Sequence, residues 1–501
     1  MDLTLYPLGE YLGLLDKLGV LAAPRPAGLD LDRTVELVSY NSGEVVPGTL
    51  FICKGAHFKA DYLAQAARKG AFAYVSETPY PGVELPCIPV RDMRRVLAPL
   101  AVKYYNDPSR KVKVVGVTGT KGKSSTAYCL KYILDELGGG CGVISSIETW
   151  DGAERFASRM TTPEPLELQR HLARAAAAGL EYVVMEASSQ ALKYHRTLGT
   201  RFAAAAFLNI GTDHISPVEH PDFDDYFRSK LKIFAQAELS CVNLDCDHAQ
   251  EVLEAARAAC PTVLTFSRRD PAAGVYGHDV RKVGHEILFR ADAAQLSGQY
   301  RLTIPGLFNV DNALAAIALC RGLGLPLEAV REGLARARVP GRMEVYSSEN
   351  GDVAAIVDFA HNRMSFETLF CSLREEYPGR RFVTVFGCPG GKAPDRRRDM
   401  GEIAGRYSDL VVLTEDDPGE EDPAAICRQI AAHVACPYVV QINRGEAIRQ
   451  AILGCDRPSV VLIAGKGVER YQKRGLEYVD TPLDSEYARA FLREYDARRG
   501  R

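Results

Sequence analysis

Residues 114–125 read Val-Val-Gly-Val-Thr-Gly-Thr-Lys-Gly-Lys-Ser-Ser, and this stretch decides the fold of the region around it. The β-branched apolar run predicts a buried strand, the glycines predict a tight turn, and a helical stretch (127–137) follows. Glycines let backbone N–H groups approach a ligand closely, and a helix N-terminus carries partial positive charge. Lys123 adds a full charge, and a hydroxyl directly after such a lysine is a usual magnesium ligand. The stretch therefore predicts a cradle for a nucleoside triphosphate, although Val117 stands where the spacing G-x-x-x-x-G-K-[ST] requires glycine.

Length and composition narrow the class of protein. A chain of 501 residues is too long for one core, so about three domains are expected. The formal net charge of -3 gives no electrostatic footprint for nucleic acid, and no apolar run approaches the ~18 residues that span a bilayer. The first 15 residues lack the basic segment of a secretory signal, and the thirteen cysteines are scattered without a C-x-x-C pair. These features predict a cytoplasmic enzyme with reduced thiols that neither binds nucleic acid nor inserts into a membrane. A monomer is expected as well, although composition does not indicate it.

Strand-like and helical segments alternate along most of the chain. Residues 1–110 hold short apolar runs separated by helical stretches, which predicts a small α/β domain. Residues 111–340 alternate in the manner of a mostly parallel sheet with helices on both faces, in which ligands gather at the carboxyl ends of strands. Pro340 and Gly341 mark a break, and a second such alternation predicts a third, Rossmann-like α/β domain over residues 341–501.

Three residues that follow separate strands of the central sheet are candidate metal ligands. They are Ser124 of the cradle, Glu186 at the end of Val183-Val184-Met185-Glu186, and His214 in Asn209-Ile210-Gly211-Thr212-Asp213-His214. Asp213 could ligate or orient. Taken singly, such a Glu is more often solvated and such a His more often a loop or core residue. Their common position after strands of one sheet favours a metal site.

Lys230 falls within the apolar stripe of a predicted helix over residues 222–234. An ammonium aimed at a core costs several kcal/mol unless it is compensated. One interpretation is that the stem packs while the head reaches water; the other is that Lys230 is chemically altered or paired at the metal site.

The sequence resembles the Mur ligases, the ATP-dependent amide-forming enzymes of peptidoglycan precursor synthesis, and within them the MurE type. The resemblance runs from residue 46 to residue 469, and its motifs are TGTKGKSS (118–125), TTPEPLELQ (161–169), MEASSQAL (185–192), LNIGTDH (208–214), DYFRSK (225–230), GLFNVDNALAA (306–316), VPGRMEV (339–345), VDFAHN (357–362) and EDDPGEEDP (415–423).

The resemblance implies roles for individual residues. ATP would be bound by Gly119, Thr120, Lys121, Gly122, Lys123, Ser124, Ser125, Asn309, Asn312, Arg342, Asp358 and His361. The catalytic residues would be Lys123, Glu186, His214 and Lys230, with Mg²⁺ held by Ser124, Glu186, His214 and a CO2 adduct (carbamate) on Lys230. UDP-MurNAc-L-Ala-D-Glu would be bound by Ser42, Thr161, Thr162, Ser188, Tyr194 and Arg196. The incoming amino acid would be bound by Lys392, Asp416, Asp417, Gly465 and Glu469.

The resemblance also implies a mechanism. A substrate carboxylate would attack the γ-phosphate of ATP, and the amine of the amino acid would then attack the acyl phosphate. Because water would hydrolyse that intermediate, the third domain is expected to close over the site.

The identity of the amino acid is predicted from residues 414–423. Members that add meso-diaminopimelate carry D-N-P-R, whose arginine pairs with the distal carboxylate, whereas Gly419 stands at that position here. The window holds six acidic residues and no basic one, which suits a substrate that ends in ammonium. L-lysine is the leading substrate and L-ornithine the next; the alternative is a solvated acidic loop.

Other readings stay open from the sequence. Gln190, Val468 and Gly43 depart from the residues that many relatives carry, which would fit a paralogue that uses ornithine, meso-diaminopimelate or another acceptor. A ligase of the folylpolyglutamate or cyanophycin type is a second alternative, and a nucleotide-binding protein without ligase activity is a third. The retained residues Lys123, Glu186, His214 and Lys230 argue against the last.

Overall fold

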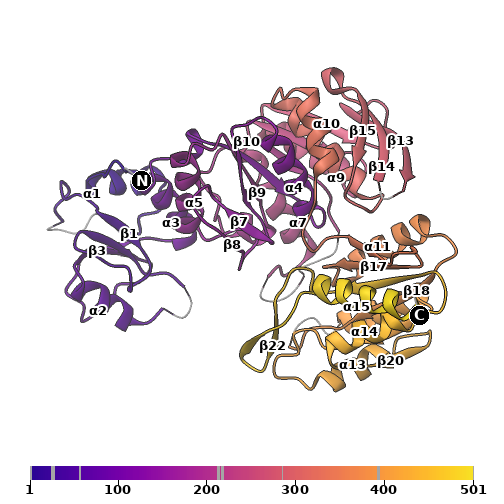
Figure 1. Cartoon of the computed structure of the whole chain (residues 1–501). Coiled ribbons are helices and arrows are strands. Elements are labelled where there is room, and N and C mark those ends of the chain that lie inside the picture. The colour runs from indigo at the N-terminus through magenta and orange to yellow at the C-terminus, as the bar shows by residue number, and fades with distance from the viewer. Residues whose placement is uncertain are drawn as a thin grey trace. The chain divides into compact units, whose positions relative to one another are not determined.

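The computed structural model describes residues 3–23, 29–55, 58–211, 215, 219–284, 286–391 and 395–499. The chain forms two compact units, Met1–Val275 with Ala315–Val330, and Tyr276–Leu314 with Arg331–Arg501. Figure 1 shows strands and helices alternating through both units. The mixed α/β fold predicted from the sequence is confirmed, whereas the domain boundaries at residues 110 and 340 stay a prediction.

The first unit begins with a small parallel sheet in the order β1-β2-β3-β4. Its strands are β1 (Leu37–Ser39), β2 (Thr49–Ile52), β3 (Ala71–Ser76) and β4 (Cys87–Pro89), and its helices are α1 (Leu8–Lys17), α2 (Ala60–Arg68) and α3 (Met93–Tyr104). Apolar residues of α1, α3 and the strands form one buried cluster. A second cluster includes residues of α2. The alternation of short elements predicted for residues 1–110 therefore builds a layered core on both faces of this sheet.

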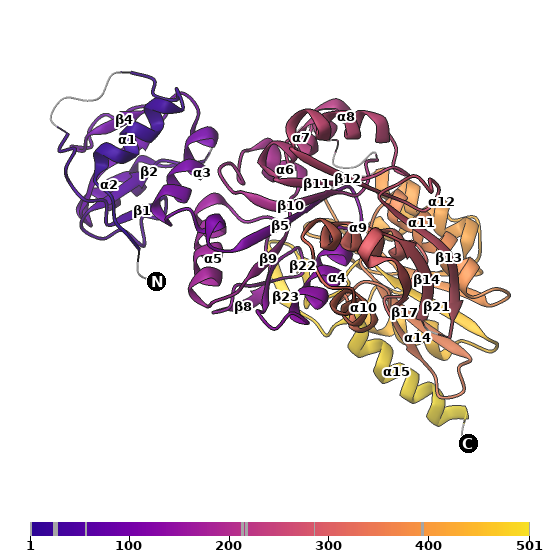
Figure 2. The ribbon, with the colours of Figure 1, turned by 90° about the horizontal axis from the view of Figure 1, so that it is seen from above.

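The central sheet of the same unit runs in the order β12-β11-β10-β5-β9-β6-β7-β8. Its strands are β5 (Lys113–Thr118), β6 (Cys141–Ile144), β7 (Glu148–Trp150), β8 (Arg155–Ala157), β9 (Tyr182–Glu186), β10 (Phe202–Phe207), β11 (Leu239–Asn243) and β12 (Thr262–Ser267). The helices between them are α4 (Lys123–Asp135), α5 (Pro165–Ala177), α6 (Ser189–Lys193), α7 (Phe223–Leu231) and α8 (Ala249–Ala259). From β12 to β6 every pairing is parallel. The carboxyl ends of β5, β9 and β10, adjacent in Figure 2, therefore lie at one edge.

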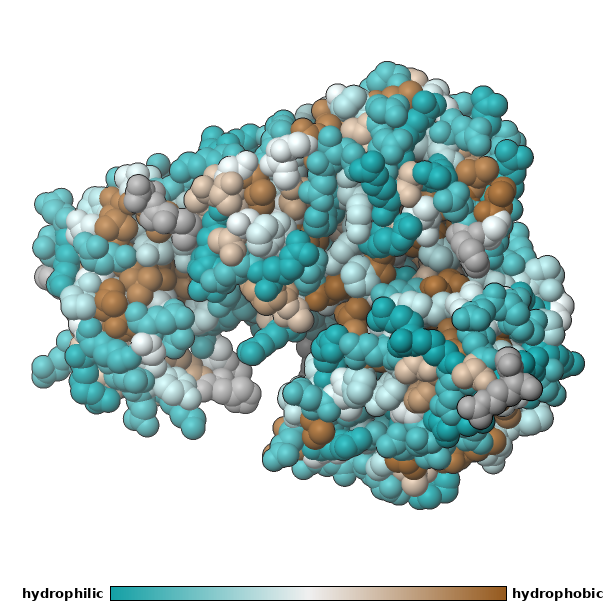
Figure 3. Space-filling view, in the orientation of Figure 1, coloured by the Kyte–Doolittle hydropathy of each residue, from teal (hydrophilic) through white to brown (hydrophobic). Residues whose placement is uncertain are grey.

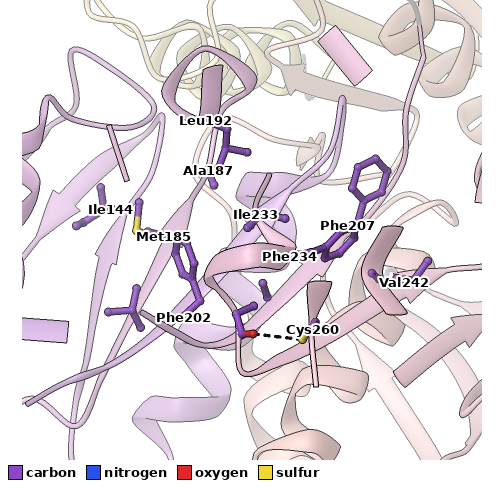
Figure 4. Packing of buried hydrophobic residues seen from close by; sticks show 14 of the residues in the cluster. Ile144, Met185, Ala187, Leu192, Phe202, Phe207, Ile233, Phe234, Val242 and Cys260 are labelled. Carbon is purple, nitrogen blue, oxygen red and sulfur yellow. Dashed lines mark hydrogen bonds between the residues drawn. The ribbon is translucent and has the colours of Figure 1, made fainter. Parts of the chain in front are cut away.

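Aromatic side chains pack against this sheet near the phosphate-binding stretch (Figure 4). Phe202 and Phe207 of β10 lie with Ile233 and Phe234, which follow α7, and all four are fully buried. Gly116 of β5 makes room for this packing, because a Cβ there would lie 2.8 Å from the Phe202 ring. Since α7 also carries Lys230, the same cluster fixes the position of that lysine.

The second unit is built on a six-stranded sheet in the order β16-β17-β21-β18-β19-β20, parallel except for β16. The strands are β16 (Glu344–Ser347), β17 (Val353–Asp358), β18 (Arg381–Phe386), β19 (Leu410–Leu413), β20 (Tyr438–Val440) and β21 (Ser459–Ala464). The helices are α11 (Arg363–Glu376), α12 (Asp395–Tyr407), α13 (Pro423–Ala431), α14 (Arg444–Leu453) and α15 (Asp484–Arg499). Two buried clusters pack against it, as expected for a parallel sheet covered on both faces.

Of the remaining elements, the sequence pattern indicated only the helical stretch that ends just before the break at Pro340. These elements are β13 (Val275–Val283), β14 (Glu286–Asp292), β15 (Gly298–Leu302), α9 (Asn309–Gly322), α10 (Leu327–Arg336), and the hairpin β22 (Tyr471–Arg474) and β23 (Glu477–Asp480). Of these, α9 and the hairpin bear on the site described below.

The surface and the thiols agree with the composition. On the face seen in Figure 3, hydrophobic residues form small groups between hydrophilic ones. All thirteen cysteines are free thiols in the structure, and their reduced state in the cell stays a prediction. Within the described ranges, no helix combines the length and the apolar character needed to cross a membrane.

Candidate active site

The phosphate-binding turn lies between the end of β5 and the start of α4. Helix α4 begins at Lys123, four residues earlier than predicted, and its N-cap is Gly122 at φ +85°. Such a backbone favours glycine and lets the first N–H groups of the helix point outward as an anion site. Asn209, which follows β10, stabilises the turn through two hydrogen bonds to the backbone of Lys121. Its Oδ1 accepts from Lys121 N at 2.9 Å, and its Nδ2 donates to Lys121 O at 3.1 Å.

Ser124 and Glu186 meet at the edge of this sheet. The Ser124 hydroxyl donates to Glu186 Oε1 at 2.8 Å, and the backbone N–H of Ser146 donates to the same oxygen at 2.9 Å. Glu186 is the last residue of β9 and is 1% exposed, so the solvated-loop interpretation of this residue is wrong. A buried hydroxyl and carboxylate side by side are oxygen donors of the kind that Mg²⁺ prefers.

Lys230 is buried against the same turn. It is 1% exposed, its Nζ donates to Gly119 O at 2.8 Å, and the ammonium lies 4.6 Å from the centre of the Tyr226 ring. The interpretation that its head reaches water is therefore wrong. Lys123 Nζ also donates to Gly119 O, at 2.9 Å, so both lysines converge on one point of the turn.

The other predicted metal ligand, His214, and its neighbour Asp213 lie outside the described residues. Within the described ranges, no group of three or more His, Cys, Asp and Glu side chains is arranged to hold a metal. The complete magnesium ligand set thus stays a prediction.

A second group of predicted residues lies around the loop before α5. Thr162 Oγ1 donates to Glu186 O at 2.8 Å and accepts from Ser188 N at 3.0 Å, and Thr161 precedes it in the same loop. Arg196 Nε lies 3.0 Å from Glu164 Oε1. Through Thr162, this loop is connected to the end of strand β9 that carries Glu186.

A cavity of about 440 Å³ opens beside these residues. It is lined by Cys53, Lys54, Gly55, Phe58, Ser76, Glu77, Thr78, Tyr80, Met93, Arg94, Leu97, Glu164, Pro165, Tyr194 and Arg196. The guanidinium of Arg94 stacks 4.0 Å from the centre of the Tyr194 ring, and Lys54 pairs with Glu164. Tyr194 and Arg196 line this cavity as well, whereas Ser42 is not among its lining residues and donates to Gln65 Oε1 at 2.8 Å.

In the second unit, the predicted nucleotide residues belong to two segments. Asn312 Nδ2 donates to Asn309 Oδ1 at 2.8 Å, and both residues are buried on α9. Asp358, at the end of β17, accepts from Met343 N at 2.8 Å. The Arg342 guanidinium lies 4.3 Å from the centre of the Phe359 ring, and His361 Nδ1 lies 2.7 Å from Phe359 O.

The acidic residues of the predicted amino-acid site gather around Lys466. Its Nζ lies 2.8 Å from Asp417 Oδ1 and 2.8 Å from Glu469 Oε2, and the residue is 2% exposed. Burial lowers the pKa of Lys466, but the carboxylates of Asp416, Glu469 and Asp417 outweigh burial and raise the pKa overall. We call Asp416, Asp417, Lys466 and Glu469 the acidic cup.

Asp416 is the buried carboxylate of the cup. Burial raises the pKa of Asp416 to about 6, against the opposing effect of Arg444 and Lys466. Gly465, at φ +114°, gives it room, because a Cβ there would come closer than 3.0 Å to Asp416 Oδ2. Four of the five predicted amino-acid-binding residues thus lie together; the fifth, Lys392, is outside the described residues.

The idea of residues 414–423 as one acidic mouth is wrong in part. Glu415 is paired with Arg474, whose Nη2 lies 2.6 Å from Glu415 Oε1, and Glu421 is paired with the buried Arg397 at 2.9 Å. Asp422 caps α13 by accepting from Ala424 N and Ala425 N. These basic partners lie far away in the sequence, so the window alone could not reveal them. Only Asp416 and Asp417 of this window belong to the cup.

Several supporting residues could not be recognised from the sequence. Four residues hold the predicted site residues in place through hydrogen bonds or an ion pair. They are Asn209, Ser146, Lys466 and Gln472. A signal existed for Asn209, which lies inside the motif LNIGTDH (208–214) quoted above.

A glycine-rich turn at the edge of a parallel sheet, beside a buried hydroxyl and carboxylate, defines a nucleotide-binding α/β protein. The Mur ligase middle domain matches residues 117–320, and the Mur ligase, glutamate ligase domain matches residues 341–467. The chain belongs to the Mur ligase family.

Individual relatives cover nearly the whole chain. It is 37% identical over 506 residues to the UDP-N-acetylmuramoyl-L-alanyl-D-glutamate--L-lysine ligase of Enterococcus faecalis (strain ATCC 700802 / V583), covering 98% of each chain. It is also 37% identical to the enzyme of the same name from Streptococcus sanguinis (strain SK36), covering 92% of this chain and 93% of that one. A solved UDP-N-acetylmuramoyl-L-alanyl-D-glutamate--2,6-diaminopimelate ligase has the same fold, with a TM-score of 0.70 at 23% identity over 99% of this chain and all of the other.

Proposed function

We propose that this protein is the ATP-dependent ligase that joins L-lysine to UDP-MurNAc-L-Ala-D-Glu through an acyl phosphate, in peptidoglycan precursor synthesis. Family membership and the names of the full-length relatives support the reaction class and both substrates. A cytoplasmic location and a monomeric state are parts of the proposal that rest on the sequence.

The observation that carries the choice of lysine is the acidic cup. Three carboxylates, those of Asp416, Asp417 and Glu469, surround one ammonium, that of Lys466. The excess of negative charge favours amino groups and disfavours a distal carboxylate. The two 2.8 Å contacts of Lys466 also indicate that these carboxylates can bind an ammonium directly.

The phosphate-binding turn supports the use of ATP. The N-terminus of α4 and the ammonium group of Lys123 present positive charge to an incoming triphosphate. Ser124 and Glu186 would hold Mg²⁺, which neutralises charge as one anion attacks another. The buried position of Lys230 beside Gly119 of the turn also fits a CO2 adduct, which would replace the cation with an anion able to hold Mg²⁺.

The other residues position the reactants. The cavity lined by Arg94, Tyr194 and Arg196 joins aromatic and cationic groups, which suits a nucleotide with a diphosphate. Thr162 links the loop beside that cavity to Glu186 at the phosphate-binding edge. A substrate bound along this path would bring its terminal carboxylate toward the γ-phosphate, and the amine of lysine would then displace phosphate from the acyl phosphate.

A panel of amino acids tests the proposal. Purified protein is given ATP, Mg²⁺ and UDP-MurNAc-L-Ala-D-Glu with L-lysine, L-ornithine or meso-diaminopimelate, and released phosphate is measured. Release is expected with lysine and requires the UDP precursor. Release with diaminopimelate and none with lysine would overturn the choice of amino acid, and release without the UDP precursor would overturn the reaction.

A further inference from the structure

Strand β22 runs along the acidic cup, and its four consecutive residues all contact the cup or the loop that carries it. The Tyr471 ring centre lies 4.7 Å from the Lys466 ammonium, and Lys473 N donates to Asp417 Oδ1 at 2.8 Å. Arg474 forms the two-bond ion pair with Glu415 described above. Gln472 contacts the backbone, since its Oε1 accepts from Asp417 N at 2.7 Å.

The hairpin also pairs with this loop through its backbone. Gly419 N donates to Lys473 O at 2.9 Å, Gly475 N donates to Gly419 O at 2.6 Å, and the two segments form a parallel bridge. The loop thus behaves as a short third strand of the two-stranded sheet β22–β23. Its conformation depends on that pairing.

Asp417 has a left-handed backbone. Its φ is +45°, in the left-handed region that costs a non-glycine residue of order 1 kcal/mol. A conformation of this kind persists only where its surroundings hold it. Gln472 is 1% exposed, and its Oε1 accepts the hydrogen bond from the backbone N–H of Asp417. This buried bond helps to hold Asp417 in the left-handed conformation.

We infer that Gln472 is a positioning residue for amino-acid selection: its bond to Asp417 N holds the Asp417 carboxylate at the depth in the cup that suits lysine rather than a shorter diamino acid. The inference rests on the proposed function, because it assumes that the cup receives the amino acid. Gln472 would act through Asp417, because its amide oxygen is bonded to the backbone N–H of that residue.

The test compares Gln472→Met, which keeps the length but removes the acceptor, with Gln472→Glu, which keeps an acceptor oxygen. Gln472→Met is expected to lower kcat/KM for lysine about tenfold, chiefly through KM, while the KM values for ATP and the UDP precursor stay within about twofold. The ratio of kcat/KM for lysine to that for ornithine should fall, and Gln472→Glu should restore most of it. Leu476→Ala, at a residue 79% exposed on the same hairpin, is the matched control and should change nothing.

The outcomes separate the inference from the proposed function. An equal loss for lysine and ornithine, or a loss of kcat alone, would overturn the role of Gln472. If thermal unfolding shows that Gln472→Met does not fold, Gln472→Asn replaces it. The asparagine side chain is shorter by one methylene, so its amide oxygen lies farther from Asp417 N, and the same loss of kcat/KM for lysine is expected. If the wild-type protein prefers another amino acid, the proposed function fails, and the inference is judged by the selectivity ratio for that amino acid.

Discussion

The ammonium of Lys230 lies 2.8 Å from the carbonyl oxygen of Gly119, inside the phosphate-binding turn. The two residues are 111 positions apart, and α7 brings them together by packing its aromatic face on β10. A buried lysine at this place supports a functional rather than a structural role, because burying an apolar side chain at a purely structural position would cost less free energy than burying an ammonium.

Lys230→Ala is expected to abolish turnover, with a loss of at least about a hundredfold in kcat. If the lysine acts as a carbamate, short carboxylic acids such as acetate should restore part of the activity by supplying the missing carboxylate. Phosphate release measured with increasing acetate checks this. Lys232→Ala, at an exposed lysine two residues away, should keep full activity. Unchanged activity of Lys230→Ala would remove the carbamate hypothesis.

The phosphate-binding edge could be predicted from the sequence largely because its signals are local. The turn and the place of Glu186 follow from short patterns of apolar, glycine and polar residues at strand ends, whereas the apolar stripe around Lys230 left open whether the head of that lysine reaches water. The acidic cup was predicted less well. Lys466 and the hairpin residue Gln472 reach residues 415–419 from about fifty positions away, and no periodicity reports a pairing of that kind.

Glu186→Gln should raise the Mg²⁺ concentration needed for half-maximal activity by about tenfold or more, because an amide is a weaker ligand than a carboxylate. Ser124→Ala should act in the same direction, since the two side chains lie 2.8 Å apart. Titrating Mg²⁺ at saturating ATP measures the effect. Thr262→Ala, at the exposed start of β12, is the control. An unaltered Mg²⁺ dependence in both variants would exclude them as ligands.

Gly465→Ala is expected to weaken lysine binding, because the added Cβ would collide with Asp416 Oδ2. We expect KM for lysine to rise about tenfold and the protein to lose about 1–3 kcal/mol of stability. Gly351→Ala is the matched control, since Gly351 also has a positive φ, +74°, but a Cβ added there would meet no atom within 4 Å. Equal effects of the two variants on KM would show that only backbone strain is involved.

Gly419→Arg should shift the amino-acid preference from lysine toward meso-diaminopimelate. The added guanidinium would meet a distal carboxylate and repel a distal ammonium, and a Cβ at Gly419 has no atom within 4 Å. The positive φ of +58° costs about 1 kcal/mol, so Gly419→Ala serves as the control for strain. Comparing kcat/KM for both amino acids in the three proteins tests the prediction, which fails if arginine and alanine act alike.

Lysine binding should weaken as pH falls through about 6, the value to which burial raises the pKa of Asp416. Arg444 and Lys466 favour the charged form, whereas Asp417 and Glu469 disfavour it. Protonation removes one negative charge from the cup, so KM for lysine should rise by up to about tenfold for each pH unit below that value.

The contribution of Asp416 to the stability of the folded protein changes with pH in the opposite direction. The folded protein holds this proton between pH 3.8 and about 6 while the unfolded chain releases it, so the stabilising contribution is complete below 3.8 and is lost as pH rises through about 6. Asp416→Asn should flatten both profiles, and an acid limb in KM that survives this substitution would assign the titration to another group.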